Sequence, residues 1–154
     1  MSLIAKKING KISLILFEPS NFNGDGSAIL AFRIKTAIKH SQLPDYHLSI
    51  VEMDIQRSSS ECGIFSLALA KKLCTERHNL LKIHEDNING ILHDGKLFLP
   101  YNELDPYLPV TFYKHTQGKG RLSAYLNTNP QAVGTVINKK MKLSLAGLIT
   151  INLL

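Results

Sequence analysis

The stretch "VEMDIQRSSSECGIF" (Val51–Phe65) changes from a strand pattern to a helix pattern over a few residues. Its apolar start is typical of a buried strand. Beyond it, one apolar stripe with helical spacing predicts a helix from about Cys62 to Arg77. The members of that stripe are Ile64, Phe65, Ala68, Leu69 and Leu73. Cys62 therefore lies at a strand-to-helix junction, at or near the first turn of the helix.

Other patterns extend this strand–helix unit in both directions. Upstream, they predict a strand over Lys11–Phe17, a helix over Ala28–His40 and a second strand over His47–Asp54. Downstream, they predict a second helix in "NLLKIHEDNINGIL" (79–92), a proline-broken and then helical stretch in "ELDPYLPVTFYKHTQGKG" (103–120) and a late strand in "QAVGTVIN" (131–138). This order predicts one mixed α/β or α+β domain.

Length and composition limit the class of protein. A chain of 154 residues that is 44% hydrophobic and 19% charged is long enough for one packed core and is not disordered in type. No run reaches the roughly 18 apolar residues of a membrane span. The run Ile12–Phe17 has strand length and ends at Glu18, so no cleavable signal peptide is expected.

Charge is unevenly distributed along the chain. The net charge is +6, and residues 106–154 contain no acidic residue. The basic residues there are Lys114, Lys119, Arg121, Lys139, Lys140 and Lys142. A surface of one sign attracts polyanions such as phosphates, although it would also serve as a solubilising face. Nucleic acid is disfavoured, because no nucleic-acid motif accompanies these residues.

Cys62 is the main candidate for chemistry. Backbone N–H groups and the dipole at a helix N-terminus stabilise a thiolate, and the same N–H groups can bind a developing oxyanion. The alternative is an inert buried cysteine, which is common. Cys74, on the same predicted helix, would lie about 18 Å away at about 1.5 Å per residue. That exceeds the ~7 Å limit for a disulfide, so both thiols are expected to be free, as in a reducing compartment.

Two further residues strengthen the case for a nucleophile. Gln56 ends the second strand six residues before Cys62, where its amide could donate to an oxyanion. Glu18 ends the first strand, where a carboxylate could orient a histidine. Both residues also have an interpretation without a catalytic role. Gln56 could be an ordinary surface residue, and Glu18 could be a polar residue that ends its strand. No histidine precedes Glu18, and the six present are His40, His47, His78, His84, His93 and His115.

Metal-site patterns fail. The segment "EDNING" has Lys96 where a calcium loop needs a bidentate glutamate, and "HEDNI" lacks the second histidine of a zincin. Cys74 and His78 could supply only two ligands, which is too few for a zinc site. No metal site is therefore expected.

Several blocks closely resemble the YopJ/AvrA family, the effectors that Gram-negative bacteria inject into host cells by type III secretion. The similarity covers roughly residues 8–140. The blocks are "SLILFEPSNFN", "VEMDIQRSSSECGIFSLALAKKL", "LLKIHEDNI", "LDPYLPVTFYKHTQGKGRL" and "YLNTNPQAVGTVINKK". The resemblance implies a cysteine-protease-like core, similar to the clan CE ubiquitin-like-protein proteases, that acts as an acetyltransferase.

The resemblance also implies roles for residues. Glu18 matches the acidic member of a His–Glu–Cys triad, Cys62 the nucleophile and Gln56 the oxyanion-hole glutamine. Acetyl-CoA would load Cys62, which would then acetylate Ser, Thr or Lys of host proteins such as MAP kinase kinases. Inositol hexakisphosphate would be the activator, with Lys114, Lys119 and Arg121 as candidate polyanion contacts. Lys114 is also a candidate for self-acetylation.

The chain departs from the family pattern at both ends. The family histidine lies on a strand just before "INGK", which would be at or before Met1, so this chain is expected to lack the histidine and to be impaired. Residues 1–140 are expected to form the core, and 141–154 a divergent tail that could be a last strand pair or an out-of-register end. The alternatives are a pseudoenzyme that binds host kinases and a clan CE protease that cleaves ubiquitin-like conjugates.

Overall fold

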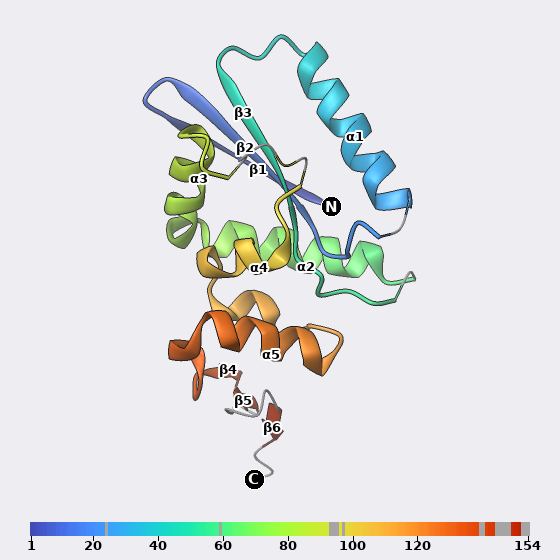
Figure 1. The fold of residues 1–154 in the computed structure, drawn as a ribbon, viewed down its shortest axis with the longest axis vertical. Coiled ribbons are helices and arrows are strands. Elements are labelled where there is room, and N and C mark those ends of the chain that lie inside the picture. Colours follow the sequence, from blue (N-terminus) through green and yellow to red (C-terminus); the bar gives the residue numbers. More distant parts are fainter. Residues whose placement is uncertain are drawn as a thin grey trace.

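The computed structural model describes residues 1–23, 25–58, 60–92, 96, 98–138, 141–143 and 149–151. It is a mixed α+β structure, as predicted, built on a three-stranded sheet in the order β1–β2–β3 (Figure 1). The strands of this sheet are β1 (Ser2–Ile8), β2 (Lys11–Glu18) and β3 (Tyr46–Glu52). β1 runs antiparallel to β2, and β2 runs parallel to β3.

The connections follow from local sequence. Asn9 and Gly10 both have positive φ and close the tight turn between β1 and β2. The parallel pair β2–β3 is joined by the long helix α1 (Asp25–His40), as a parallel pair requires a crossover. In this register Glu18 faces Glu52 at the carboxyl ends of the two strands.

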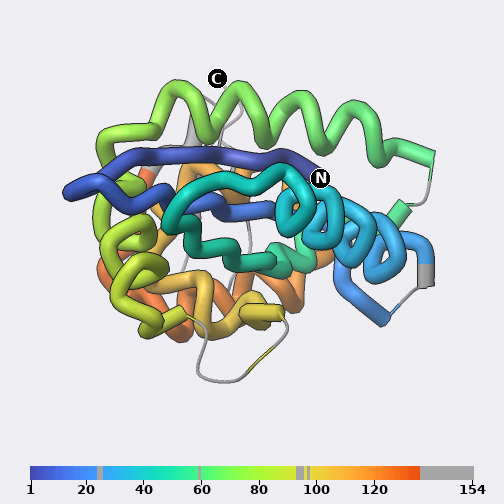
Figure 2. The backbone as a smooth tube through the Cα atoms, turned by 90° about the horizontal axis from the view of Figure 1, so that it is seen from above, coloured from blue at the N-terminus to red at the C-terminus, as the bar shows by residue number. Residues whose placement is uncertain are grey.

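The two faces of the sheet are covered differently. Ile15, Phe17 and Val51 face the larger core, whereas Leu16 and Ile50 face a smaller cluster that includes Ala31 of α1. Helix α2 (Cys62–Thr75) contributes Phe65, Leu69 and Leu73 to the larger core and runs alongside β1 (Figure 2). Ile64 and Ala68, both expected in that stripe, are instead exposed, Ile64 to 72%, because both lie on the same side of the row formed by Phe65, Leu69 and Leu73.

The second half of the chain consists of short elements. They are the 3₁₀ helix η1 (Arg77–Leu80), α3 (Leu81–Ile88), α4 (Tyr101–Leu104), the 3₁₀ helices η2 (Asp105–Tyr107) and η3 (Val110–Tyr113), α5 (Lys119–Thr128) and the 3₁₀ helix η4 (Pro130–Ala132). The helix expected over 79–92 is therefore shorter, because α3 begins at Leu81 and ends at Ile88. The stretch over 103–120 is broken at its prolines, as predicted. Pro106 and Pro109 each lie at the start of a 3₁₀ turn.

A second small sheet contains β4 (Val136–Asn138), β5 (Met141–Leu143) and β6 (Ile149–Ile151), all antiparallel. The expected strand over 131–138 is wrong in its first half. Pro130 begins a 3₁₀ turn there, and Gly134 has φ of 85°, so that the described strand comprises only the last three residues of the expected range. β4 and β5 pair across the expected boundary between residues 140 and 141, and that division of the chain stays a prediction.

A buried polar network joins α3 to the sheet. Asn87 donates from Nδ2 to Oγ of Ser13 at 2.8 Å and accepts at Oδ1 from Ser49 Oγ at 2.6 Å. His84 Nδ1 lies 2.8 Å from the same Ser13 hydroxyl. Burial, followed by the charge of Lys6, lowers the pKa of His84 to about 4. Because every one of these polar groups is paired, the network fixes how α3 packs on β2 and β3.

Candidate active site

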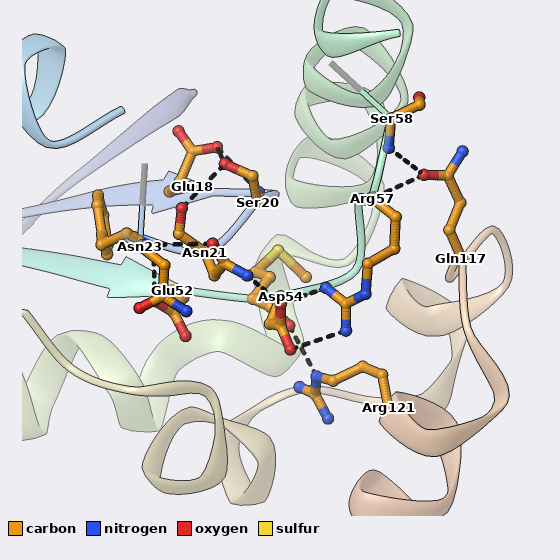
Figure 3. A network of polar contacts seen from close by, with 12 residues as sticks. Glu18, Ser20, Asn21, Asn23, Glu52, Asp54, Arg57, Ser58, Gln117 and Arg121 are labelled. Atoms are coloured by element: carbon orange, nitrogen blue, oxygen red, sulfur yellow. Dashed lines mark hydrogen bonds and ion pairs between the residues drawn. The ribbon is translucent and has the colours of Figure 1, made fainter. Parts of the chain in front are cut away.

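The chain leaves the sheet after Glu52 and turns towards Cys62 through a bent segment. The N–H of Met53 donates to the carbonyl of Glu18, and the N–H groups of Ile55 and Gln56 donate to that of Pro19. Asp54 has φ of 52°, and its carboxylate accepts from the guanidinium of Arg57 and from Nδ2 of Asn21 (Figure 3). These contacts fix the end of β3, so Gln56 emerges beside the first turn of α2.

Cys62 is the first residue of α2, as the sequence predicts, and it is exposed rather than buried. The preceding residue, Glu61, makes no side-chain capping hydrogen bond to the helix. The apolar stripe of α2 determines this placement, since packing of Phe65 and Leu69 in the core leaves the start of the helix at the surface. Exposure removes the plain interpretation of Cys62 as a buried core residue.

Gln56 contacts the thiol directly. Its Nε2 donates to Sγ of Cys62 at 3.0 Å and to the carbonyl of Ser58 at 2.5 Å. The side chain is only 4% exposed, so it is a buried amide with a fixed orientation and not surface decoration. A fixed N–H donor beside a thiol can stabilise negative charge on sulfur or on an oxygen bound to the carbon that the sulfur attacks.

Glu18 lies at the same end of the sheet, buried to 6% exposure. Its Oε1 accepts from the N–H of Ser20 at 2.9 Å and from the Ser20 hydroxyl at 2.5 Å. Within the described part of the chain, no histidine is hydrogen-bonded to Glu18. His84 lies in the α3 network instead, and His93 is outside the described residues.

A second carboxylate, which the sequence analysis did not single out, lies beside Glu18. Glu52 ends β3 and accepts from the N–H of Phe22 at 2.9 Å. Burial raises its pKa, and the nearby charges of Asp54 and Glu18 act in the same direction, while the Phe22 hydrogen bond opposes them. The matching strand ends of a parallel pair were the signal that could have identified it.

The thiol and the amide share a cleft of ≈ 350 Å³ at the carboxyl ends of the strands. Its lining also includes Ser20, Ser27 and Arg57. The cleft therefore brings Cys62 and Gln56 together with Ser20, the hydrogen-bond partner of Glu18. In the sequence these residues are distributed over three separate segments.

The three basic candidates lie in different environments. Lys119 begins α5 and is exposed, and Lys114 lines a second cleft of ≈ 580 Å³. Arg121 is 3% exposed, and its guanidinium donates to both oxygens of Asp105, at 2.8 and 2.5 Å. It also lies over the rings of Tyr101 and Tyr113. The structure thus separates Arg121 from the other two, because its charge is already paired inside the core.

The cleft at Lys114, called the cationic cleft below, is lined by basic and by apolar side chains. Lys71, Lys72 and His115 line it together with Phe65 and Phe112. Burial lowers the pKa of His115, and the charges of Lys114 and Lys72 lower it further. Glu76 is the acidic residue in this lining, and its Oε1 lies 3.7 Å from Lys72 Nζ. The positive potential of this cleft is therefore only partly balanced.

Two further searches of the described residues concern membrane-spanning helices and metal-binding clusters. None of the helices described is both long and apolar enough to cross a membrane. The described side chains also contain no group of three or more His, Cys, Asp or Glu residues able to hold a metal ion.

These observations define an α+β domain with an exposed cysteine at a helix N-terminus and a buried amide donor against its sulfur. Comparison with known proteins specifies the family. Residues 2–149 match the model of the YopJ serine/threonine acetyltransferase family. The chain therefore belongs to this family.

Named relatives agree with this assignment. The chain is 76% identical over 135 residues to the serine/threonine-protein acetyltransferases YopJ of Yersinia pestis and Yersinia pseudotuberculosis. The match covers 88% of this chain and 47% of each relative, so the chain spans about half of their length.

Solved structures give the same result. A deletion variant of AvrA with IP6 and CoA superposes with a TM-score of 0.83 at 55% identity, over 90% of this chain and 52% of that one. HopZ1a in complex with IP6 superposes with a TM-score of 0.70 at 17% identity, over 93% and 55% of the respective chains, and that likeness is one of fold.

Proposed function

We propose that this chain carries the nucleophile of a two-step acetyl transfer from acetyl-CoA to a hydroxyl or amine of a host protein. The observation that carries the proposal is the 3.0 Å contact from Gln56 Nε2 to Cys62 Sγ in a chain of this family. In the first step, the Cys62 thiolate attacks the thioester carbonyl. A new C–S bond forms, the old one breaks, and the CoA thiolate leaves and takes up a proton.

The second step regenerates the cysteine. A Ser or Thr hydroxyl, or a neutral Lys amine, attacks the acetyl carbonyl on Cys62 and loses a proton to a base. The C–S bond breaks and the thiolate returns. In both steps negative charge develops on the carbonyl oxygen, and Gln56 is the donor positioned to receive it. The second N–H of its amide stays on Ser58, which keeps the donor aimed at the thiol.

Glu18 is proposed to orient the imidazole that serves as base in this family. Ser20 already holds one of its oxygens, and the carboxylate is buried at the end of β2. No histidine among the described residues is hydrogen-bonded to Glu18. We therefore expect acetyl transfer by this chain alone to be slow. General acid–base catalysis contributes about 10²–10⁴-fold.

The cationic cleft is the proposed site for an inositol polyphosphate. AvrA and HopZ1a were each solved with IP6, and a phosphate-rich ligand fits a cleft lined by Lys71, Lys72, Lys114 and His115. Lys119, exposed at the start of α5, is a further candidate. Arg121 is not included, because its guanidinium is already bound to Asp105. Lys114 is also proposed to accept acetyl by self-modification.

The proposed targets are host signalling proteins, in particular the activation loops of MAP kinase kinases, reached by type III secretion into the host cytoplasm. Acetylation of a loop hydroxyl would prevent the phosphorylation that orders such a loop. A pseudoenzyme that binds the kinase without modifying it is the second candidate. This candidate is favoured because no histidine among the described residues is hydrogen-bonded to Glu18.

The test incubates the chain with labelled acetyl-CoA, inositol hexakisphosphate and a recombinant MAP kinase kinase. Acetyl on activation-loop residues, lost in Cys62→Ala, supports the transferase. Kinase binding that survives Cys62→Ala, with no label transferred, supports the pseudoenzyme. If neither binding nor transfer occurs, the proposed targets are wrong.

A further inference from the structure

Gln117 lies far from the nucleophile in sequence but next to its loop in space. It follows η3 and precedes α5, and its own N–H donates to the carbonyl of Ile55 at 2.8 Å. That bond fixes the backbone of Gln117 against the segment that leaves β3. The side chain consequently projects towards Arg57 and Ser58 (Figure 3).

The Gln117 amide joins three points of this loop. Its Oε1 accepts from the N–H of Arg57 at 2.6 Å and from the N–H of Ser58 at 2.9 Å. Its Nε2 donates to Oε2 of Glu61 at 2.6 Å. The same Glu61 oxygen accepts from the Ser58 hydroxyl at 2.7 Å. One side chain thus holds both ends of the connection that leads into α2.

The contacts continue to the sulfur through one peptide group and one amide. Ser58, whose N–H is held by Gln117, offers its carbonyl to Nε2 of Gln56, and that same nitrogen donates to Cys62 Sγ. If Ser58 moves, its carbonyl no longer fixes the rotation of the Gln56 amide. Glu61, the other contact of Gln117, directly precedes the nucleophile.

We propose that Gln117 is a positioning residue for Cys62: it holds Arg57, Ser58 and Glu61 so that the Gln56 amide points at the thiol. This deepens the proposed role of Cys62 as nucleophile. The hydrogen-bond partners of the Gln117 side chain are Arg57, Ser58 and Glu61, so its proposed effect on the sulfur passes through Ser58 and Gln56. A purely structural crosslink would stabilise the fold without changing the relative reactivity of Cys62.

The test measures alkylation of two thiols in one molecule by iodoacetamide at fixed pH, with each cysteine peptide quantified by mass spectrometry. Cys74 is the internal reference, because it is also exposed and lies on the same helix. Alkylation requires no acetyl-CoA, so failure of the positioning role is distinguishable from failure of the acetyl-transfer proposal.

Gln117→Ala is expected to slow alkylation of Cys62 by about fivefold, the equivalent of one hydrogen bond of about 1 kcal/mol, and to leave Cys74 unchanged. The matched control is Gln131→Ala, since Gln131 is an exposed glutamine in η4, and it should change neither rate. An unchanged Cys62 rate, or a proportional change at both thiols, would overturn the proposal.

A second pair of variants covers the case in which Gln117→Ala does not fold. Gln117→Glu alone retains the acceptor for both N–H groups but places two carboxylates together, so the Cys62 rate should fall. Adding Glu61→Gln supplies an amide that donates to the new carboxylate at position 117, while that carboxylate still accepts from both N–H groups, so the rate should return to within about twofold of the parent. A folded double variant that stays slow would contradict the positioning role.

Discussion

Gln56 and Cys62 form a donor–acceptor pair across the strand-to-helix junction, with Nε2 of the amide 3.0 Å from Sγ. The amide is buried and the thiol is exposed, so the donor is held by the core while the sulfur remains accessible. Removal of the donor should therefore affect the chemistry of Cys62 more than its accessibility.

Gln56→Ala is expected to slow acetyl loading of Cys62 by about 10²–10³-fold, the usual effect of deleting one oxyanion donor. The rate is measured from the mass of the Cys62 peptide after mixing with acetyl-CoA. Ser123→Ala, which removes a hydroxyl that donates to the carbonyl of Lys119 in the same helix, is the control and should load at the parent rate. Equal loading by Gln56→Ala and the parent would remove Gln56 from the mechanism.

Arg121 is expected to act on stability. Its side chain and that of Asp105 are 1% and 0% exposed, and loss of one partner from a buried pair costs about 3–5 kcal/mol. Arg121→Ala should lower the free energy of unfolding in urea by roughly that amount.

The matched control for this pair is Lys82→Ala. Lys82 pairs with Asp86 at 2.7 Å but is 74% exposed, and such pairs contribute about 0–1 kcal/mol. If Arg121→Ala costs no more than Lys82→Ala, the buried pair is not the stabilising element described.

Because the pKa of His84 is lowered in the folded state, the protein is expected to lose stability in acid. Its folded-state pKa of about 4 is below the unfolded value of 6.5, so the unfolded chain binds more protons between these values. Stability is therefore full above about pH 6.5 and falls as the pH drops towards 4, by at most about 3 kcal/mol from this group.

Urea unfolding at several pH values should show a shallower acid slope for His84→Gln than for the parent. His40→Gln, a change at an exposed histidine in the last turn of α1, should leave the slope unaltered. Identical slopes for His84→Gln and the parent would rule out His84 as the source.

The cationic cleft gives a prediction for His115. Because the charge of Lys114 contributes to the lowered pKa of His115, Lys114→Gln should raise that pKa. Bound inositol hexakisphosphate should raise it as well, since nearby phosphate charge favours the imidazolium. Titration of the imidazole resonance by NMR measures both effects.

Lys119→Gln is the control for this titration, because Lys119 does not contribute to the shift at His115. If Lys114→Gln and Lys119→Gln move the His115 pKa equally, the cleft does not have the described electrostatics. A polyphosphate that binds without changing the His115 resonance binds elsewhere.

Local patterns were sufficient for the strand–loop–helix unit. A continuous apolar run and a helical stripe are determined by near neighbours, so β2, α1, β3 and α2 lie close to their predicted bounds. β1 was not identified because "SLIAKKI" is an edge strand with alternating exposure and two lysines. Ile64 was misplaced because stripe membership does not specify which edge of the stripe is buried.

The features that local patterns did not predict depend on contacts between residues far apart in the sequence. Gln117 lies 59 residues from Ser58 in sequence, and Arg121 lies 16 from Asp105, so no local spacing reveals either pairing. The composition of the last third indicated an unpaired basic surface, whereas Asp105, the final acidic residue, neutralises Arg121 in the core. Sequence gives the charges of this segment, but the fold determines which of them face solvent.

Cys62 is the residue proposed to accept the acetyl group from acetyl-CoA. The most direct measurement is the mass of the Cys62 peptide after the chain is incubated with acetyl-CoA and inositol hexakisphosphate. One acetyl is expected on Cys62, labile to hydroxylamine as a thioester and lost with Cys62→Ala. Acetyl that accumulates on other residues at the same rate in Cys62→Ala, with none on Cys62 in the parent, would contradict it.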